Sequence, residues 1–261
     1  MRIDEPLKAL LRLDDGALMR GAFFLLLSAA AVFLLIDVRD ITAMNAELPG
    51  FDPMLEDQPV LPPALTEGVP NGPSVQPASP DEVLRQPMKF ELTSGGILLA
   101  EGTIDLGAGA RFAEEIETRG EYVTTVALNS PGGSVDDALA ISKLIREKKL
   151  NTKVASKALC ASSCPIIFAG GVGRLAEEDA IVGVHQVFNG SRERPTAEQA
   201  ASFAQSTTAR VARHLDAMGI DAGLWINALE TPPDRLYYLT AKEMADFKLI
   251  TGPVATAKKK S

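Results

Sequence analysis

The sequence predicts an α/β domain with a mainly parallel sheet, preceded by an apolar N-terminal helix and a proline-rich linker. Three observations carry this prediction. Residues 21–36 form an uninterrupted apolar run, residues 37–87 contain ten prolines, and residues 88–254 alternate short apolar runs with amphipathic segments. Strands that alternate with helices are typical of parallel sheets, because the helices make the crossovers between strands.

The apolar run Gly21–Ile36 is the candidate membrane anchor. As a helix it is about 24 Å long, slightly short of a bilayer core, and it can be extended toward the N-terminus. Four basic residues precede the run, and only Arg39 follows it before residue 85. The positive-inside rule then puts residues 1–20 in the cytoplasm and the rest of the chain outside. The alternative is a cleaved signal peptide with a weak site at Ala43–Ala46.

Residues 37–87 are expected to form a flexible tether. A proline-rich segment with few aromatic residues cannot bury enough apolar area to offset the entropy of ordering. Residues 255–261 include the basic cluster Lys258–Lys260 and are expected to be a disordered tail. The net charge of -8 and the pI near 4.9 argue against a nucleic-acid partner.

Within the domain, the hydrophobic pattern predicts strands at Lys89–Thr93, Ile97–Ile104, Tyr122–Leu128, Thr152–Ala155 and Ala180–Val184. It predicts helices at Ala110–Arg119, Val135–Lys148, Ser163–Ala169 and Thr196–Met218.

The chain has only two cysteines, Cys160 and Cys164. Their spacing differs from the C-x-x-C of most cytosolic redox pairs, and two further zinc ligands are missing nearby. In an oxidising compartment they could form a local disulfide, although a bridge across four residues is geometrically tight. The sequence is compatible with a bridge and with free thiols.

The segment Asn129–Ser134, with the sequence N-S-P-G-G-S, joins a predicted strand to a predicted helix. Adjacent glycines let the backbone turn sharply and expose N–H groups that can stabilise an oxyanion. A tight turn without chemistry is the alternative. The loop lacks the glycine patterns of nucleotide sites, and nothing in the chain calls for a metal or an organic cofactor.

Two serines, Ser162 and Ser163, precede a helix that is apolar on all sides. A hydroxyl at the start of a buried helix is shielded from water in a positive field, which suits a nucleophile. One of the two serines can equally be the helix N-cap. A β-branched strand ends at His185, a candidate base. The other histidine, His214, stands among charged residues, and we expect it at the surface.

The order of these motifs is more specific than any one of them. A strand leading into S-P-G-G, then A-S-S at a helix start, then V-H-Q at a strand end resembles the Clp-protease class of serine peptidases over residues 88–254. The set is most similar to membrane-anchored, periplasmic Clp-like proteins of bacteria. The resemblance implies the repeated β-β-α spiral of the ClpP/crotonase superfamily, with the domain in the periplasm behind an inner-membrane anchor.

The resemblance also implies roles for single residues. Ser162 becomes the nucleophile, His185 the base, and the backbone N–H groups of Gly133 and Ser163 the oxyanion donors. The helix Thr196–Met218 occupies the position of the family's handle helix, which implies a homo-oligomer. An extracytoplasmic site has no ATP, so the expected substrates are small or already unfolded polypeptides.

Two positions depart from the family pattern. Cys164 replaces a glycine beside the nucleophile, and Leu236 stands where the catalytic acid is expected. Asp234 is the nearest acid and our candidate for the third member of the triad. Glu230 and Asp221 are the fallback candidates.

Three other functions fit parts of the pattern. Leu236 favours a non-catalytic scaffold or binding protein that has lost the acid. A crotonase-type acyl-CoA enzyme would also use paired N–H groups, but it needs neither Ser162 nor His185 in this order and would lack CoA outside the cytoplasm. A serine–lysine peptidase would use Lys157, but His185 makes that dyad unnecessary.

Overall fold

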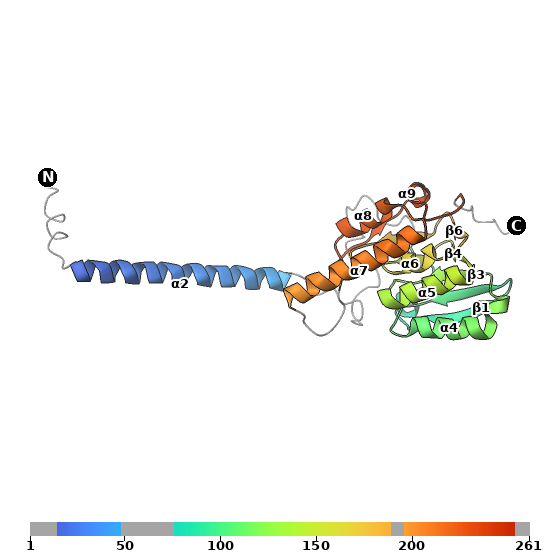
Figure 1. Ribbon diagram of the computed structural model, residues 1–261, viewed down its shortest axis with the longest axis horizontal. Helices are drawn as coiled ribbons and strands as arrows, with labels where there is room; N and C mark the ends of the chain where they lie inside the picture. Colours follow the sequence, from blue (N-terminus) through green and yellow to red (C-terminus); the bar gives the residue numbers. More distant parts are fainter. Residues whose placement is uncertain (1–14, 48–75, 189–195, 254–261) are drawn as a thin grey trace. The chain divides into compact units, whose positions relative to one another are not determined.

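The computed structural model describes residues 15–47, 76–188 and 196–253 (Figure 1). These residues belong to two compact units, an N-terminal helix and a C-terminal domain. The predicted basic tail at 255–261 and the middle of the predicted tether, residues 48–75, lie outside the described residues.

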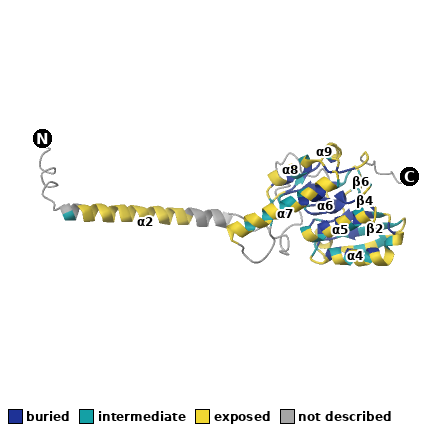
Figure 2. Ribbon diagram, in the orientation of Figure 1, coloured by how far each residue is buried: buried dark blue, intermediate teal, exposed yellow. Residues whose placement is uncertain are grey.

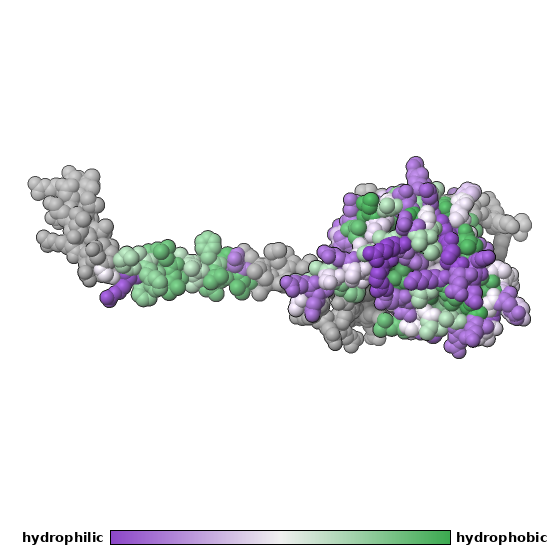
Figure 3. All heavy atoms as spheres, viewed as in Figure 1, coloured by the Kyte–Doolittle hydropathy of each residue, from purple (hydrophilic) through white to green (hydrophobic). Residues whose placement is uncertain are grey.

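Helix α2 (Asp15–Glu47) contains the candidate anchor and extends beyond it at both ends. Its segment Met19–Arg39 has 21 residues and a mean hydropathy of 2.4, and its side chains are not buried (Figures 2 and 3). At 1.5 Å per residue this segment spans about 32 Å, close to the thickness of a bilayer core. The helix is therefore a candidate membrane span, although a signal sequence would have the same length and composition.

A five-stranded sheet forms the larger sheet of the domain. Its order is β1-β2-β3-β4-β6, with β1 (Lys89–Thr93), β2 (Ile97–Glu101), β3 (Thr125–Asn129), β4 (Asn151–Val154) and β6 (Arg174–Ala176). β1 and β2 form an antiparallel hairpin, and the remaining neighbours are parallel. The predicted α/β class with a mainly parallel sheet is confirmed.

Helices α4 (Ala108–Arg119) and α5 (Val135–Glu147) pack against each other and share the main core with this sheet. The buried residues of α5 recur at helical spacing, with Ala138, Ile141 and Ile145 on one face. Ser134 caps α5, because its side chain accepts a hydrogen bond from the N–H of Asp137. The cap fixes where the glycine loop ends.

A second sheet of three strands supports the candidate site. It contains β5 (Leu159–Ala161), β7 (Ile181–Val184) and β8 (Tyr237–Tyr238), in the order β5-β7-β8. An isolated bridge between Ser130 and Cys160 joins the end of β3 to β5. Helix α6 (Cys164–Ala169) follows β5, and every residue of it is buried (Figure 2).

Three α-helices follow β7 in the described part of the domain: α7 (Ala197–Ala217), α8 (Ala222–Glu230) and α9 (Ala241–Asp246). Thr196 begins α7 through a capping box with Gln199. The surface position expected for His214 on α7 was wrong. His214 is 7% exposed and its Nε2 lies 2.8 Å from the Oγ of Ser142, because it shares the buried face of the helix with Val211 and Leu215.

The end of the predicted tether belongs to the domain. Helix α3 (Asp81–Leu84) precedes β1, and the N–H of Ala78 donates to the carbonyl of Lys157 at 2.9 Å. Leu84 is fully buried in a small apolar cluster with residues of β5, β7 and β8. The tether predicted over 37–87 therefore differs from the structure at both ends, since α2 also continues to Glu47. Burial of a single leucine, about 1.5–3 kcal/mol, helps to offset the ordering of this short segment.

Candidate active site

Ser162 lies in the sharp turn between β5 and α6. Its φ is +59°, in the left-handed region that residues with a side chain rarely adopt. Its N–H donates to the carbonyl of Gly183 at 3.0 Å, which ties the turn to β7. The turn leaves the serine half-buried between two elements whose other residues form the core.

His185 follows β7 and reaches the same point. β5 and β7 are parallel, with Ala161 opposite Gly183, so the residues that follow the two strands emerge side by side. The Nε2 of His185 lies 2.7 Å from the Oγ of Ser162. This is the distance at which a base can take a proton from a nucleophile.

The imidazole of His185 is neutral at pH 7. Burial disfavours its charged form and lowers the pKa to about 4, while a backbone hydrogen bond at Pro233 and the negative charge of Asp234 act in the opposite direction. Burial is the larger effect. The Nδ1 atom is buried and has no hydrogen-bond partner of normal geometry among the described residues, so the contact with Pro233 is weak.

The structure does not bring Asp234 into hydrogen-bonding contact with His185. The Oδ1 of Asp234 pairs with the Nε of Arg235 at 3.3 Å, and both side chains are partly exposed. The influence of Asp234 on the imidazole is therefore electrostatic and acts at a distance.

The other positions considered for the acid do not reach the histidine either. Leu236 is buried in the apolar cluster of the small sheet. Asp221 caps α8, where its carboxylate accepts from the N–H of Gly223 at 2.9 Å. Glu230 is exposed at the end of the same helix. Among the described residues, none of the candidate carboxylates forms a hydrogen bond with His185.

The glycine loop lies directly beside the serine turn. A Cβ added to Gly132 would meet the Cβ of Ser162 at 2.5 Å, and one added to Gly133 would meet the carbonyl of Ile104 at 2.3 Å. The Oγ of Ser163 donates to the carbonyl of Gly133 at 3.0 Å. Within the described chain, the N–H groups of Gly133 and Ser163 donate to no protein acceptor.

Comparison with known proteins assigns this fold and geometry to a family. The model of the Clp protease family matches residues 117–256, more than half of the chain. The chain belongs to the Clp protease family. The solved structure of a point mutant of ClpP1 from Listeria monocytogenes is similar, with a TM-score of 0.50 and 17% sequence identity. The match covers 62% of this chain and 92% of that one, and it shows a shared fold.

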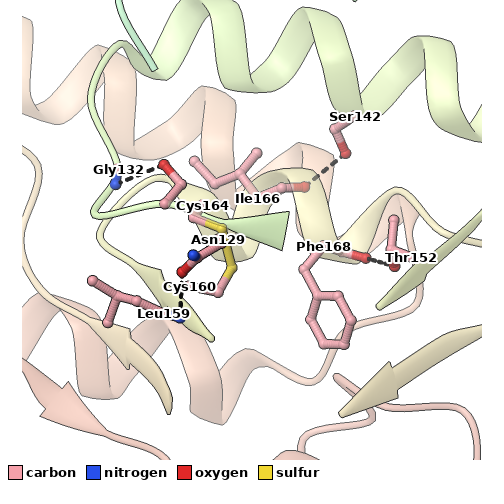
Figure 4. Close-up of a disulfide and its surroundings, with 10 residues drawn as sticks. Asn129, Gly132, Ser142, Thr152, Leu159, Cys160, Cys164, Ile166 and Phe168 are labelled. Atoms are coloured by element: carbon pink, nitrogen blue, oxygen red, sulfur yellow. Dashed lines mark hydrogen bonds between the residues drawn. A yellow bond between two sulfur atoms is a disulfide. The ribbon is translucent and has the colours of Figure 1, made fainter. Parts of the chain in front are cut away.

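This Clp protease family chain carries a disulfide around its candidate nucleophile. A disulfide joins Cys160 on β5 to Cys164, the first residue of α6 (Figure 4). The two cysteines precede and follow Ser162 in the chain. Both cysteines are fully buried. The bridge closes a loop that contains the left-handed serine, so it restricts the conformations open to the turn.

Two polar residues at the end of β3 bind the backbone around the site: Asn129 binds β5 and Ser130 binds the glycine loop. The Oδ1 of Asn129 accepts from the N–H of Leu159 at 2.9 Å, and the Oγ of Ser130 accepts from the N–H of Gly132 at 3.1 Å (Figure 4). Sequence reasoning included both residues in the motif but gave them no task. Polar side chains at the end of a buried strand were the signal, since buried polar groups need partners.

Proposed function

We propose that this protein is a membrane-anchored, extracytoplasmic serine hydrolase, specifically a peptidase that acts on small or unfolded polypeptides. The observation that carries the proposal is the 2.7 Å contact between the Oγ of Ser162 and the Nε2 of His185. Membership of the Clp protease family supports a serine-protease-like activity.

In the proposed reaction, Ser162 attacks the carbonyl carbon of the scissile peptide while His185 takes its proton. The N–H groups of Gly133 and Ser163 hold the resulting oxyanion, and loss of one such donor typically costs about 2.7–4 kcal/mol. The imidazolium then protonates the leaving amine as the C–N bond breaks. A water molecule, deprotonated by His185, hydrolyses the acyl-enzyme and restores the serine.

Asp234 is proposed to stabilise the imidazolium. Its charge already favours the protonated ring, although it is paired with Arg235. A rotation of this carboxylate toward Nδ1 on substrate binding would complete the triad and supply the missing partner. The reaction needs neither a metal nor an organic cofactor. Among the described residues, no group of three or more His, Cys, Asp or Glu side chains is arranged to hold a metal.

The proposed location rests on the basic residues that flank the apolar segment of α2. Four basic residues precede its apolar segment and one follows it closely, which favours a cytoplasmic N-terminus and a single-pass anchor in the inner membrane. The disulfide supports an extracytoplasmic domain, because disulfides persist in oxidising compartments such as the periplasm.

We also propose that the chain forms a homo-oligomer. The first half of α7, residues 197–206, has no buried residue, whereas the second half packs into the core. A helix that projects in this way offers a surface to another copy of the chain, and Phe203 on it is 42% exposed.

A non-catalytic scaffold is the second candidate function, and the Nδ1 atom of His185 favours it. Without a partner for Nδ1, the tautomer that places a lone pair on Nε2 is not fixed. A pKa of about 4 also makes the imidazole a weak base at neutral pH. In this case Ser162 would not react with electrophiles.

Labelling by a fluorophosphonate serine probe separates the two functions. The full chain, purified in detergent, is compared with its Ser162→Ala, His185→Ala and Ser163→Ala variants. We expect labelling to be lost in the first two, because nucleophile or base is removed, and retained in Ser163→Ala, whose backbone N–H is unchanged. In-gel fluorescence and mass spectrometry of the labelled peptide give the result.

Two other results would change the conclusion. Loss of labelling only in Ser163→Ala would move the nucleophile by one residue. A folded wild-type protein that is not labelled at all, whether oxidised or reduced, would exclude the hydrolase and leave the scaffold.

A further inference from the structure

A narrow pocket opens beside the two residues of the candidate active site. It begins at Ser162 and His185 and extends between three helices. α6 contributes Ile166, α7 contributes Leu215, and α8 contributes Leu224, Trp225 and Ala228. The lining is mostly apolar. Among the described residues that form it, Ser162, His185 and Trp225 carry polar side-chain atoms, and the Nε1 of Trp225 is buried without a hydrogen-bond partner.

The pocket is small. The volume open to the centre of a water-sized molecule is about 20 Å³. A cavity needs about 10–15 Å³ of such volume to hold one water molecule. The pocket can therefore hold one chemical group about as large as a water molecule. A methyl group meets this limit. The branched side chain of leucine and the ring of phenylalanine exceed it.

The wall has little freedom to expand. Leu224 and Ala228 are each 1% exposed and lie one turn apart on α8, and Leu215 is 5% exposed on α7. Well-packed interiors resist the insertion of additional methylene groups, which forces neighbouring side chains out of their preferred rotamers. A charged side chain would lose its water without gaining a charged partner, because no acidic side chain, lysine or arginine is among the described residues that line the pocket.

We infer that the enzyme cleaves after residues with very small side chains, and that alanine is the preferred residue on the acyl side of the cleaved bond. This inference rests on the proposed hydrolase function. Ser162 lines the pocket, and the side chain proposed to enter it is that of the residue whose carbonyl Ser162 attacks. Leu215, Trp225 and Ala228 set the size limit.

The test uses the full chain in detergent and four peptidyl diphenyl phosphonates that differ only in the side chain beside phosphorus. The side chains are those of alanine, valine, leucine and phenylalanine. In each reaction Ser162 forms a bond to phosphorus, a phenolate leaves and His185 takes the serine proton. We expect the alanine analogue to react at least about 10-fold faster than the leucine and phenylalanine analogues, since each misfitted methylene in an apolar pocket is worth about 10-fold or more.

Two variants in the wall make the inference specific. Leu215→Ala enlarges the pocket and should raise the rate of the leucine analogue relative to the alanine analogue by about 10-fold. Leu139→Ala is the matched control, because Leu139 is also 5% exposed but lies on α5, outside the pocket. Ala228→Val opens no cavity and should slow the alanine analogue by a larger factor than it slows a fluorophosphonate without a peptide.

The outcomes are distinguishable. A leucine or phenylalanine analogue that reacts faster than the alanine analogue in the wild type overturns the inference and leaves the hydrolase intact. The inference is also overturned if the ratio of the leucine-analogue rate to the alanine-analogue rate is the same in Leu215→Ala and Leu139→Ala, and Ala228→Val leaves the rate of the alanine analogue unchanged. If neither the phosphonates nor the fluorophosphonate reacts, the proposed function fails and the inference fails with it.

Discussion

At the scale of single residues, the protonation of His185 connects the structure to a measurable pH dependence. Burial lowers its pKa from 6.5 to about 4, so the imidazole is neutral at pH 7 and stays neutral in mildly acidic solution. We expect the rate of fluorophosphonate labelling to reach half of its maximum near pH 4. Removal of the nearby charge in Asp234→Asn should move this midpoint lower still, because Asp234 raises the pKa.

The same shift affects stability. Below pH 6.5 the unfolded chain binds a proton at this histidine that the folded chain does not bind until about pH 4. The contribution of His185 to the free energy of unfolding is therefore fully present above pH 6.5. It falls by about 3 kcal/mol as the pH drops to about 4. If the rate of fluorophosphonate labelling instead reached half of its maximum near pH 6.5, the environment of His185 would not be the buried one of the structure. Its imidazole would then be hydrated or paired at Nδ1.

Single residues also show what a sequence can reveal about a site. Ser162 and His185 were predicted because three short motifs occur in a fixed order. The burial of His214 could have been predicted from Val211 and Leu215, which share its helix face, but its charged neighbours concealed this pattern. The direction of the Asp234 side chain depends on how a loop packs, and no local pattern predicts that.

At the scale of elements, strand length decided which predictions succeeded. The five-residue strand β1 was predicted at its observed bounds, whereas β5 and β6, with three residues each, were not predicted. So short a run carries no periodicity. The pairing of β5 with β7 is non-local, and it is this pairing that brings Ser162 to His185. The sequence could therefore indicate both residues without giving their geometry.

Helix α3 is an element whose importance only the structure reveals. Leu84 on α3 is fully buried against β5, β7 and β8, whereas its neighbour Val83 is 38% exposed. We expect Leu84→Ala to lower the free energy of unfolding by about 2–5 kcal/mol, as large-to-small core substitutions do. Val83→Ala is the control and should change it by no more than about 0.5 kcal/mol. Denaturant unfolding of both variants measures the difference.

Equal effects of the two substitutions would mean that α3 does not pack on the small sheet in solution. A large effect specific to Leu84 would instead require that any soluble version of the domain begin before α3. A chain that starts at Met88 would lose the segment that covers β5, the strand that leads into Ser162.

At the scale of the whole molecule, the disulfide connects the proposed membrane anchor to the candidate site. Helix α2 can hold the chain in a membrane, and the side of the membrane decides whether Cys160 and Cys164 meet an oxidising solution. Both sulfurs are buried, so the bridge must form before or during folding of the domain. Because the bridge encloses Ser162, the side of the membrane on which the domain folds would also affect the conformation of this candidate nucleophile.

Expression of the same domain on the two sides of the membrane tests this link. Full-length protein is compared with a chain that begins at Gln76 and stays in the cytosol, with thiols trapped by alkylation at lysis. We expect no alkylated cysteine in the full-length chain and two in the cytosolic chain. We also expect the fluorophosphonate to label the cytosolic chain about 10-fold more slowly than the full-length chain. The left-handed conformation costs a non-glycine residue about 1–2 kcal/mol, so a free turn leaves it most of the time. Equal labelling rates in the two redox states would mean that Gly183 and α6 hold Ser162 without the bridge, and that its function is stability alone.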